Sequence, residues 1–249
     1  MRYLGSKNKI ASDIIPIIQS YIDEDTEGFI DCFCGGANII DKISCKNKIA
    51  IDIHPQLIAL LNYAKTNSDK IPDRITEEEY NKVKNNKTDY EDWYVGLVGF
   101  CSSFGAKYFG GYARNCKGDN SGDWSASAIK TLKEQSKRFN DINFVCMDFR
   151  DIDITKINNY VIYCDIPYRD TTKYKTKDFP YDDFYEFAKR LSKNNIVIIS
   201  EYNMPSEFDV IWEKKIKTNI DNNISKNTQE RTRTEKLFIY NRKEWYYGR

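Results

Sequence analysis

The sequence predicts a doubly wound α/β fold with a terminal antiparallel hairpin and an inserted, mostly helical segment. Short apolar runs that end in an aspartate alternate with stretches of helical periodicity, as parallel strands and their connecting helices do. Residues 66–140 are polar and lack long apolar runs, which sets them apart from the rest of the chain. Two strand-like runs near the end, 208–212 and 236–240, are expected to pair as the hairpin.

The first part of the chain is expected to contain a helix, a strand, a glycine turn and a second strand. Isoleucines recur at roughly helical spacing from residue 10 onward, with Pro16 as an interruption. Residues 28–37 predict a short apolar strand with an acid near its end that runs into two glycines, and residues 38–43 are typical of the start of a helix. Residues 48–53 predict the second strand, and Pro55 suits the first turn of the next helix.

The remaining elements follow from the same patterns. Short helices are expected near 76–85, 90–103 and 125–140, and another at 181–191. Apolar runs predict strands at 143–149, 161–165 and 195–200. A polar segment at 219–234 would join the two strands of the hairpin, and residues 171–178 are expected to form a loop beside the site.

The turn after the first strand indicates a nucleoside-bearing cofactor. Gly35 and Gly36 let a ligand approach the backbone closely, and Asp52 follows Gly35 by seventeen residues, where an acid can hold ribose hydroxyls. The pattern is neither a dinucleotide fingerprint nor a P-loop, so no phosphate cradle is expected. Adenosylmethionine, which has an adenosine and no phosphates, fits best. The alternative is a purely structural turn.

The run 161–168 is the strongest candidate for chemistry. It is a buried strand that ends at Asp165 and continues as Ile166, Pro167 and Tyr168. Parallel strands carry their chemistry at the carboxyl edge. A carboxylate, a backbone carbonyl and an aromatic face would together suit a flipped-out base with an exocyclic amine. The alternative is a strand followed by an ordinary turn.

The charge of the chain is balanced overall but clustered locally. The net charge is +1, yet residues 104–138 hold seven Lys or Arg against three Asp or Glu, and residues 213–249 hold ten against five. Such clusters can follow a phosphate backbone, although most are solvated faces. Glycines and aromatics interleave with basic residues in 104–115, which favours stacking on bases. The DNA-binding candidates there are Lys107, Tyr108, Tyr112 and Arg114.

Cysteines and hydropathy exclude several classes of protein. The seven cysteines lie at 32, 34, 45, 101, 116, 146 and 164, an odd number with no secretory signal before them. Reduced thiols in a cytoplasmic protein are therefore expected. With a single histidine, His54, and no paired cysteines at zinc spacing, no metal is expected. No apolar run approaches the roughly 18 residues of a membrane span.

Four separated blocks resemble the Dam-like class of DNA adenine-N6 methyltransferases, in that family's order. They are residues 2–7, 31–37, 51–54 and 165–168. The resemblance implies a Rossmann-like methyltransferase fold, S-adenosyl-L-methionine as cofactor, and transfer to the N6 amino group of adenine at specific DNA sites. The implied catalytic residues are Asp165, Ile166, Pro167 and Tyr168. The implied cofactor-binding residues are Tyr3, Lys7, Asp31, Phe33, Gly35, Gly36, Asp52, Ile53, Asp148, Phe149 and Asp165.

The resemblance also implies a domain plan and a partner. Residues 1–65 and 141–249 would form the catalytic domain, and 66–140 the target-recognition insert. The expected partner is double-stranded DNA, bound by a monomer in the cytoplasm of a bacterium or of a phage-infected bacterial host, without membrane or metal. Three positions depart from the family: Ala37 replaces a frequent glycine, His54 the usual asparagine, and Ile166 the first proline of the catalytic motif.

Three alternatives stay open on the sequence alone. A cytosine-N4 methyltransferase or an RNA adenine methyltransferase would use a similar set of groups around an exocyclic amine. A DNA-binding relative could keep the fold and have lost transfer, because Ile166 keeps the carbonyl but not the fixed φ of proline.

Overall fold

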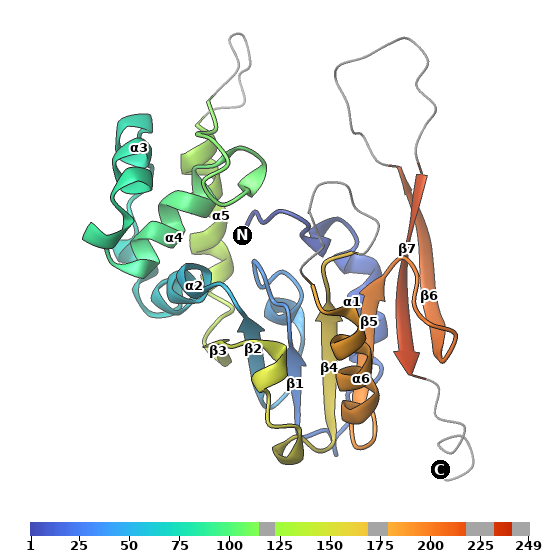
Figure 1. The fold of residues 1–249 in the computed structure, drawn as a ribbon. Helices are drawn as coiled ribbons and strands as arrows, with labels where there is room; N and C mark the ends of the chain where they lie inside the picture. The colour runs from blue at the N-terminus through green and yellow to red at the C-terminus, as the bar shows by residue number, and fades with distance from the viewer. Residues whose placement is uncertain (115–122, 169–178, 218–231, 241–249) are drawn as a thin grey trace, which may run out of the picture. The chain divides into compact units, whose positions relative to one another are not determined.

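The computed structural model describes residues 1–114, 123–168, 179–217 and 232–240 (Figure 1). The chain divides into two compact units, Met1–Ile152 and Asp153–Arg249. Each unit combines helices with part of a β-sheet, so the predicted α/β class is confirmed.

The first unit contains three parallel strands in the order β3-β2-β1. Their bounds are Gly28–Asp31 for β1, Lys48–Asp52 for β2 and Ile142–Cys146 for β3. Because parallel neighbours end at the same edge of a sheet, Asp31 and Asp52 lie at one carboxyl edge, with Asp31 paired to Ala50 and Asp52 to Cys146.

Five α-helices accompany these strands among the described residues of the first unit. They are α1 Ala11–Gln19, α2 Pro55–Asn67, α3 Glu77–Asn85, α4 Asp92–Cys101 and α5 Trp124–Ser136. Helix α2 packs on β2, β3, α4 and α5, and α3 packs on α4 (Figure 1). The close crossing of α2 and α4 depends on Gly96, since a Cβ there would lie 2.1 Å from the Gln56 carbonyl oxygen.

The second unit contains strands in the order β4-β5-β7-β6. Strands β4 (Tyr160–Asp165) and β5 (Ile196–Glu201) are parallel. Strand β6 (Phe208–Lys217) pairs with β7 (Thr232–Tyr240) as an antiparallel hairpin, and β7 also pairs antiparallel with β5. Helix α6 (Tyr181–Leu191) packs against β5. The predicted terminal hairpin is therefore confirmed.

Three local predictions differ from the structure. The helix expected at 38–43 was wrong, since only the 3-10 turn Ile40–Lys42 forms there: Ala37 has φ +55° and Ile43 is already extended. Helix α1 continues through Pro16 to Gln19 instead of being interrupted. Strand β7 begins at Thr232, within the segment expected to be a loop. The rest of that segment, 219–231, and the expected loop at 171–178 lie outside the described residues.

The described residues lack membrane-spanning helices, metal clusters and disulfides. None of their helices is long and apolar enough to cross a membrane. No group of three or more His, Cys, Asp or Glu side chains in the described ranges could hold a metal ion. The six cysteines within those ranges are free thiols, and Cys116 lies outside them.

Candidate functional site

The glycine turn after β1 is fastened to the end of β2 through Asp52. The two oxygens of the Asp52 carboxylate accept hydrogen bonds from the backbone N–H groups of Gly35 and His54, both at 3.0 Å. The N–H of Cys34 donates to the carbonyl of Ile51 at 2.9 Å. Gly35 has φ +47°, in the left-handed region that favours glycine. The two strand ends thus form one backbone cradle around a carboxylate.

The electrostatics of this carboxylate are set by two opposing effects. Burial raises the pKa of Asp52, and the hydrogen bonds from the His54 and Gly35 backbone oppose that rise. Each carboxylate oxygen has a second lone pair beyond the one used by the backbone, so Asp52 can accept further hydrogen bonds from a ligand.

The N-terminal block packs onto this turn. A Cβ at Gly35 would lie 2.7 Å from Tyr3 Cε1, and one at Gly36 would lie 2.9 Å from Tyr3 Cβ. The ring of Tyr3 also contacts Phe100, with centroids 5.7 Å apart. Lys7 follows in a short 3-10 turn and is half-buried. The structure therefore brings two of the predicted blocks together.

Gln135 and Asn38, which the sequence did not single out, support the same turn. Gln135 Nε2 donates to the carbonyls of Gly36 and Ala37 at 3.0 and 3.1 Å. Asn38 Nδ2 donates to Ser6 Oγ at 2.9 Å. Both amides come from positions without any motif, so no signal in the sequence points to them.

The other predicted cofactor residues of this unit surround the same strand ends. Phe33 and Phe149 are in ring contact at 5.8 Å, although they follow different strands. Asp31 is buried at the end of β1, and Ile53 is 66% exposed just after β2. Asp148 differs in character, because Arg150 Nη2 lies 2.7 Å from its Oδ2 and that hydrogen-bonded pair lowers the pKa of the carboxyl.

His54 has a packing role that the sequence did not predict. Its ring meets the edges of Phe100 and Tyr108, with centroids 5.1 and 4.5 Å away. Burial lowers the pKa of His54, which keeps the imidazole neutral at pH 7. Tyr108, a predicted DNA-binding residue, thus packs against the segment that follows Asp52.

The motif 165–168 lies in the second unit at the end of β4. Asp165 pairs in register with Ser200 of β5 and is partly exposed. Ile166 is 2% exposed, so its side chain is packed in the interior. Pro167 is exposed, and its carbonyl accepts a hydrogen bond from the Tyr181 hydroxyl at 2.8 Å.

Tyr168 is held by side chains from β5 and β7. Its hydroxyl donates to Glu235 Oε2 at 2.7 Å and lies 2.8 Å from Ser200 Oγ, which can then act as the donor. Burial, followed by the nearby Asp165 carboxylate, raises the pKa of Tyr168, so the phenol stays protonated and can donate. The ring of Tyr202 meets that of Tyr168 edge-on, at 4.3 Å.

The sequence did not identify Glu235, Ser200 or Tyr202 as site residues. Ser200 ends an apolar run that was predicted as a strand, which is a weak positional signal. Glu235 lies within a charged stretch, and nothing in the sequence around it indicates a site residue.

The four predicted DNA-binding residues are in different environments. Lys107 is exposed, whereas Tyr108 and Tyr112 are half-buried. The Tyr112 hydroxyl donates to the Ile75 carbonyl at 2.9 Å. Arg114 is exposed and forms a two-point ion pair with Glu77, with Nε to Oε2 at 2.9 Å. That hydrogen bond lowers the pKa of Glu77.

Comparison with known families gives an assignment. The D12 class N6 adenine-specific DNA methyltransferase family matches residues 3–95 and 93–230. The chain belongs to this family. The match confirms the resemblance seen in the four sequence blocks. The family match includes both the glycine turn and the motif 165–168.

One curated relative is the type II methyltransferase M.FokI of Planomicrobium okeanokoites, 26% identical over 196 residues. The alignment covers 69% of this chain and 29% of that relative, so the chain matches less than a third of its length.

Solved structures show more distant likenesses. A precorrin 8w decarboxylase from Methanobacterium thermoautotrophicum has a TM-score of 0.43 at 9% identity, covering 94% of this chain and 89% of that one. The magnesium protoporphyrin IX methyltransferase from Synechocystis PCC 6803 with bound SAM has a TM-score of 0.37 at 7% identity, covering 94% and 79%. The assignment depends on the family match and not on these structures.

Proposed function

We propose that the chain transfers the methyl group of S-adenosylmethionine to the N6 amino group of adenine at specific sites in double-stranded DNA. The observation that carries this proposal is the motif 165–168, in which a partly exposed carboxylate ends a buried strand beside an anchored tyrosine. The family to which the chain belongs is named for the same reaction.

The proposed roles at the motif follow from the chemistry of an aromatic amine. The Asp165 carboxylate and the Ile166 carbonyl accept hydrogen bonds from the 6-amino group and orient the nitrogen lone pair. The extruded base stacks on Tyr168, whose ring is fixed through its hydroxyl. Pro167 stiffens the backbone between them. Because the amine attacks directly, no cysteine has to act as a nucleophile.

The first unit is proposed to hold the cofactor, which supplies a methyl group on a sulfonium. Tyr3 occupies the space that a Cβ would take at Gly35 and Gly36, so the two glycines let the N-terminal block pack closely on the turn that would hold the cofactor. Asp52 would accept from the ribose hydroxyls, and the exposed Ile53 would contact the adenine face. Tyr3, Lys7, Asp31, Phe33, Asp148 and Phe149 complete the proposed set, with Asp165 contributed by the motif.

Target recognition is proposed for residues 66–140, which join β2 to β3. The remaining segments, 1–65 and 141–249, would form the catalytic domain. Lys107 and Arg114 would contact phosphates. Tyr108 and Tyr112 belong to the same segment and would contribute to its DNA-binding surface.

The experiment is methyl transfer from labelled S-adenosylmethionine to unmethylated duplex DNA, with the product digested to nucleosides. The label should appear in N6-methyldeoxyadenosine. Label in N4-methyldeoxycytidine, label only in an RNA substrate, or DNA binding without transfer would each replace the proposal by one of the alternatives. Methylation-aware sequencing of the product then gives the recognition site.

Asp165→Ala is the matched negative control and the first testable prediction. Loss of a preorganised hydrogen-bonding group lowers a rate by about 10²–10³-fold, so single-turnover transfer should fall at least that far. Asp165→Asn, which keeps one acceptor oxygen, should retain a remnant. Circular dichroism should show that both variants are folded. A folded Asp165→Ala protein with the normal rate would contradict the proposed role.

A further inference from the structure

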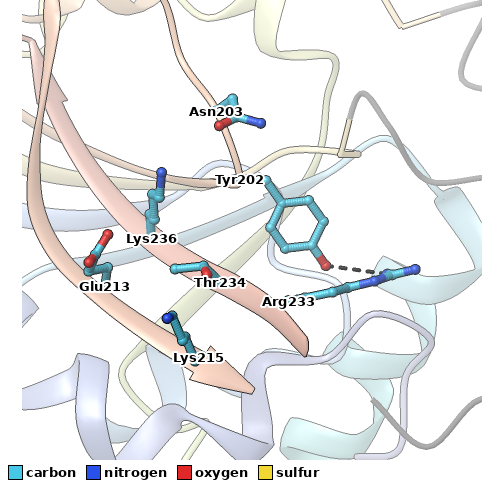
Figure 2. Close-up of a pocket in the computed structure, with 7 residues that line it drawn as sticks. All are labelled: Tyr202, Asn203, Glu213, Lys215, Arg233, Thr234 and Lys236. Atoms are coloured by element: carbon cyan, nitrogen blue, oxygen red, sulfur yellow. Dashed lines mark hydrogen bonds between the residues drawn. The ribbon is translucent and has the colours of Figure 1, made fainter. Parts of the chain in front are cut away.

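The second unit contains a pocket that none of the proposed roles uses. Its volume is about 600 Å³. Residues of the hairpin strands β6 and β7 form most of its lining, and Tyr202 and Asn203 form the rest (Figure 2). The lining residues are Tyr202, Asn203, Glu213, Lys215, Arg233, Thr234 and Lys236. Pockets of this size hold ligands as large as a nucleotide.

The charge of the pocket favours an anion. The lining contains three cationic side chains, Lys215, Arg233 and Lys236, and one carboxylate, Glu213. Lys215 pairs in register with Thr234, and Lys236 with Glu213, which places these four residues on the same face of the hairpin. Among the described residues, no ion pair within 4.0 Å involves any of the three cations.

The pocket wall is connected to the proposed catalytic motif. Tyr202 lines the pocket and meets the ring of Tyr168 edge-on at 4.3 Å. The Tyr202 hydroxyl donates to Glu235 Oε1 and accepts from Arg233 Nη1, both at 3.4 Å. Glu235 is the same carboxylate that accepts from Tyr168. A ligand in the pocket would therefore lie one aromatic ring away from Tyr168.

We propose that this pocket binds a backbone phosphate of the DNA strand, next to the nucleotide that is methylated. The inference depends on the proposed function, because it takes DNA as the partner. Lys and Arg contacts to phosphate position a duplex without reading its sequence. Lys215 and Lys236 would neutralise the phosphate, and the link through Tyr202 and Glu235 would couple its position to Tyr168.

The test compares DNA affinity and its salt dependence between the wild-type protein and a double variant, Lys215→Gln with Lys236→Gln. Both side chains are on the hairpin surface, and the glutamines remain polar. The dissociation constant for duplex DNA should rise roughly 10-fold, and the slope of log affinity against log salt should fall by about 0.9 for each phosphate that is no longer neutralised. The dissociation constant for S-adenosylmethionine should not change.

Two single variants make the result specific to the pocket. Lys193→Gln removes an exposed lysine elsewhere in the same unit and should leave DNA affinity unchanged. Glu213→Gln removes the carboxylate of the pocket and should tighten DNA binding. Opposite effects of Glu213→Gln and the lysine pair would support the proposal.

An unchanged affinity and salt slope in the double variant would overturn the inference, as would an equal loss in Lys193→Gln. Failure of the proposed function gives a different result, because the wild-type protein would then not methylate adenine in DNA. Methyl transfer by the wild-type protein is measured in the same preparation, so the two failures are separate.

Discussion

The turn after β1 and the turn after β4 both follow strands that end in aspartate, but they are held in different ways. The first is held through its own main chain, since the Gly35 and His54 N–H groups donate to the Asp52 carboxylate and the Gly36 and Ala37 carbonyls accept from Gln135. The second is held by side chains, since Ser200 and Glu235 fix Tyr168 and Tyr181 donates to the Pro167 carbonyl.

This difference determines what each turn tolerates. A turn built from backbone N–H groups depends on dihedral angles and on the absence of side-chain bulk, so it is sensitive to any Cβ at its glycines. A turn built from side chains depends on particular hydroxyl and carboxylate groups, so conservative replacements can preserve it. Substitutions in the two turns should therefore differ in which replacements restore function.

Gly35→Ala should have the largest effect in the first turn. The φ of +47° adds about 1–2 kcal/mol of strain for a residue with a Cβ. The new Cβ would also lie 2.7 Å from the Tyr3 ring. We expect a loss of affinity for S-adenosylmethionine of about 100-fold, in the range for strain plus overpacking. Isothermal titration calorimetry measures it.

Gly5→Ala is the matched control, because Gly5 has φ +82° but a Cβ added there would have no neighbouring atom within 4 Å. The affinity of Gly5→Ala for S-adenosylmethionine should therefore reflect the backbone strain without a steric clash. If both variants lose the same affinity, contact with Tyr3 does not contribute to the cradle.

Asp52→Ala should weaken binding of S-adenosylmethionine by about 1–3 kcal/mol, the range for lost hydrogen bonds to a charged group. It also leaves the Gly35 and His54 N–H groups without their acceptor, so the melting temperature without ligand should fall. An unchanged dissociation constant would remove the ribose assignment and leave Asp52 with a structural role.

The stability effect of Asp52 should depend on pH in a defined direction. Burial raises the pKa of Asp52 in the folded protein, so between the unfolded and folded pKa values the folded state binds more protons. The contribution of Asp52 to the free energy of unfolding is therefore fully present below its pKa in the unfolded chain, about 3.9. It is lost as the pH rises through its pKa in the folded protein. Denaturant titrations should show that the difference in free energy of unfolding between the wild type and Asp52→Ala becomes smaller as the pH rises over that interval.

Glu235→Ala should reduce the rate of methyl transfer about 10-fold, which is at the lower end of the effect of losing a hydrogen bond to a charged group. Tyr168 and Tyr202 would both lose an acceptor. Glu235→Gln should restore most of the rate, since the amide oxygen can still accept from Tyr168. Single-turnover rates at saturating DNA and cofactor separate this positioning effect from binding. Equal rates in the alanine variant and the wild type would contradict it.

The smallest effect is expected at Arg114, because its guanidinium already pairs with Glu77 on the surface. Arg114→Ala should change DNA affinity less than Lys107→Ala does. Glu77→Gln should release the guanidinium and strengthen DNA binding a few-fold, with a salt slope steeper by up to about one unit. Fluorescence anisotropy at several salt concentrations measures all three variants. A larger loss in Arg114→Ala than in Lys107→Ala would show that the ion pair opens on DNA.

The α/β class, the acids at the strand ends and the glycine turn beside Asp52 were all predictable from the amino-acid sequence. These features are local, because a strand, a helix or a turn is specified by the spacing of apolar residues and glycines along a short segment. The same locality explains why the helix expected at 38–43 was wrong, since Ala37 adopts a positive φ that its residue type does not announce.

The side chains that complete the site became apparent only in the folded chain. Glu235 reaches Tyr168 from 67 positions away, Ser200 from 32, and Glu77 reaches Arg114 from 37. The placement of β7 between β5 and β6 brings Glu235 to Tyr168 and Arg233 to Tyr202. Strand order and side-chain packing set such contacts, and neither leaves a periodic pattern in the sequence.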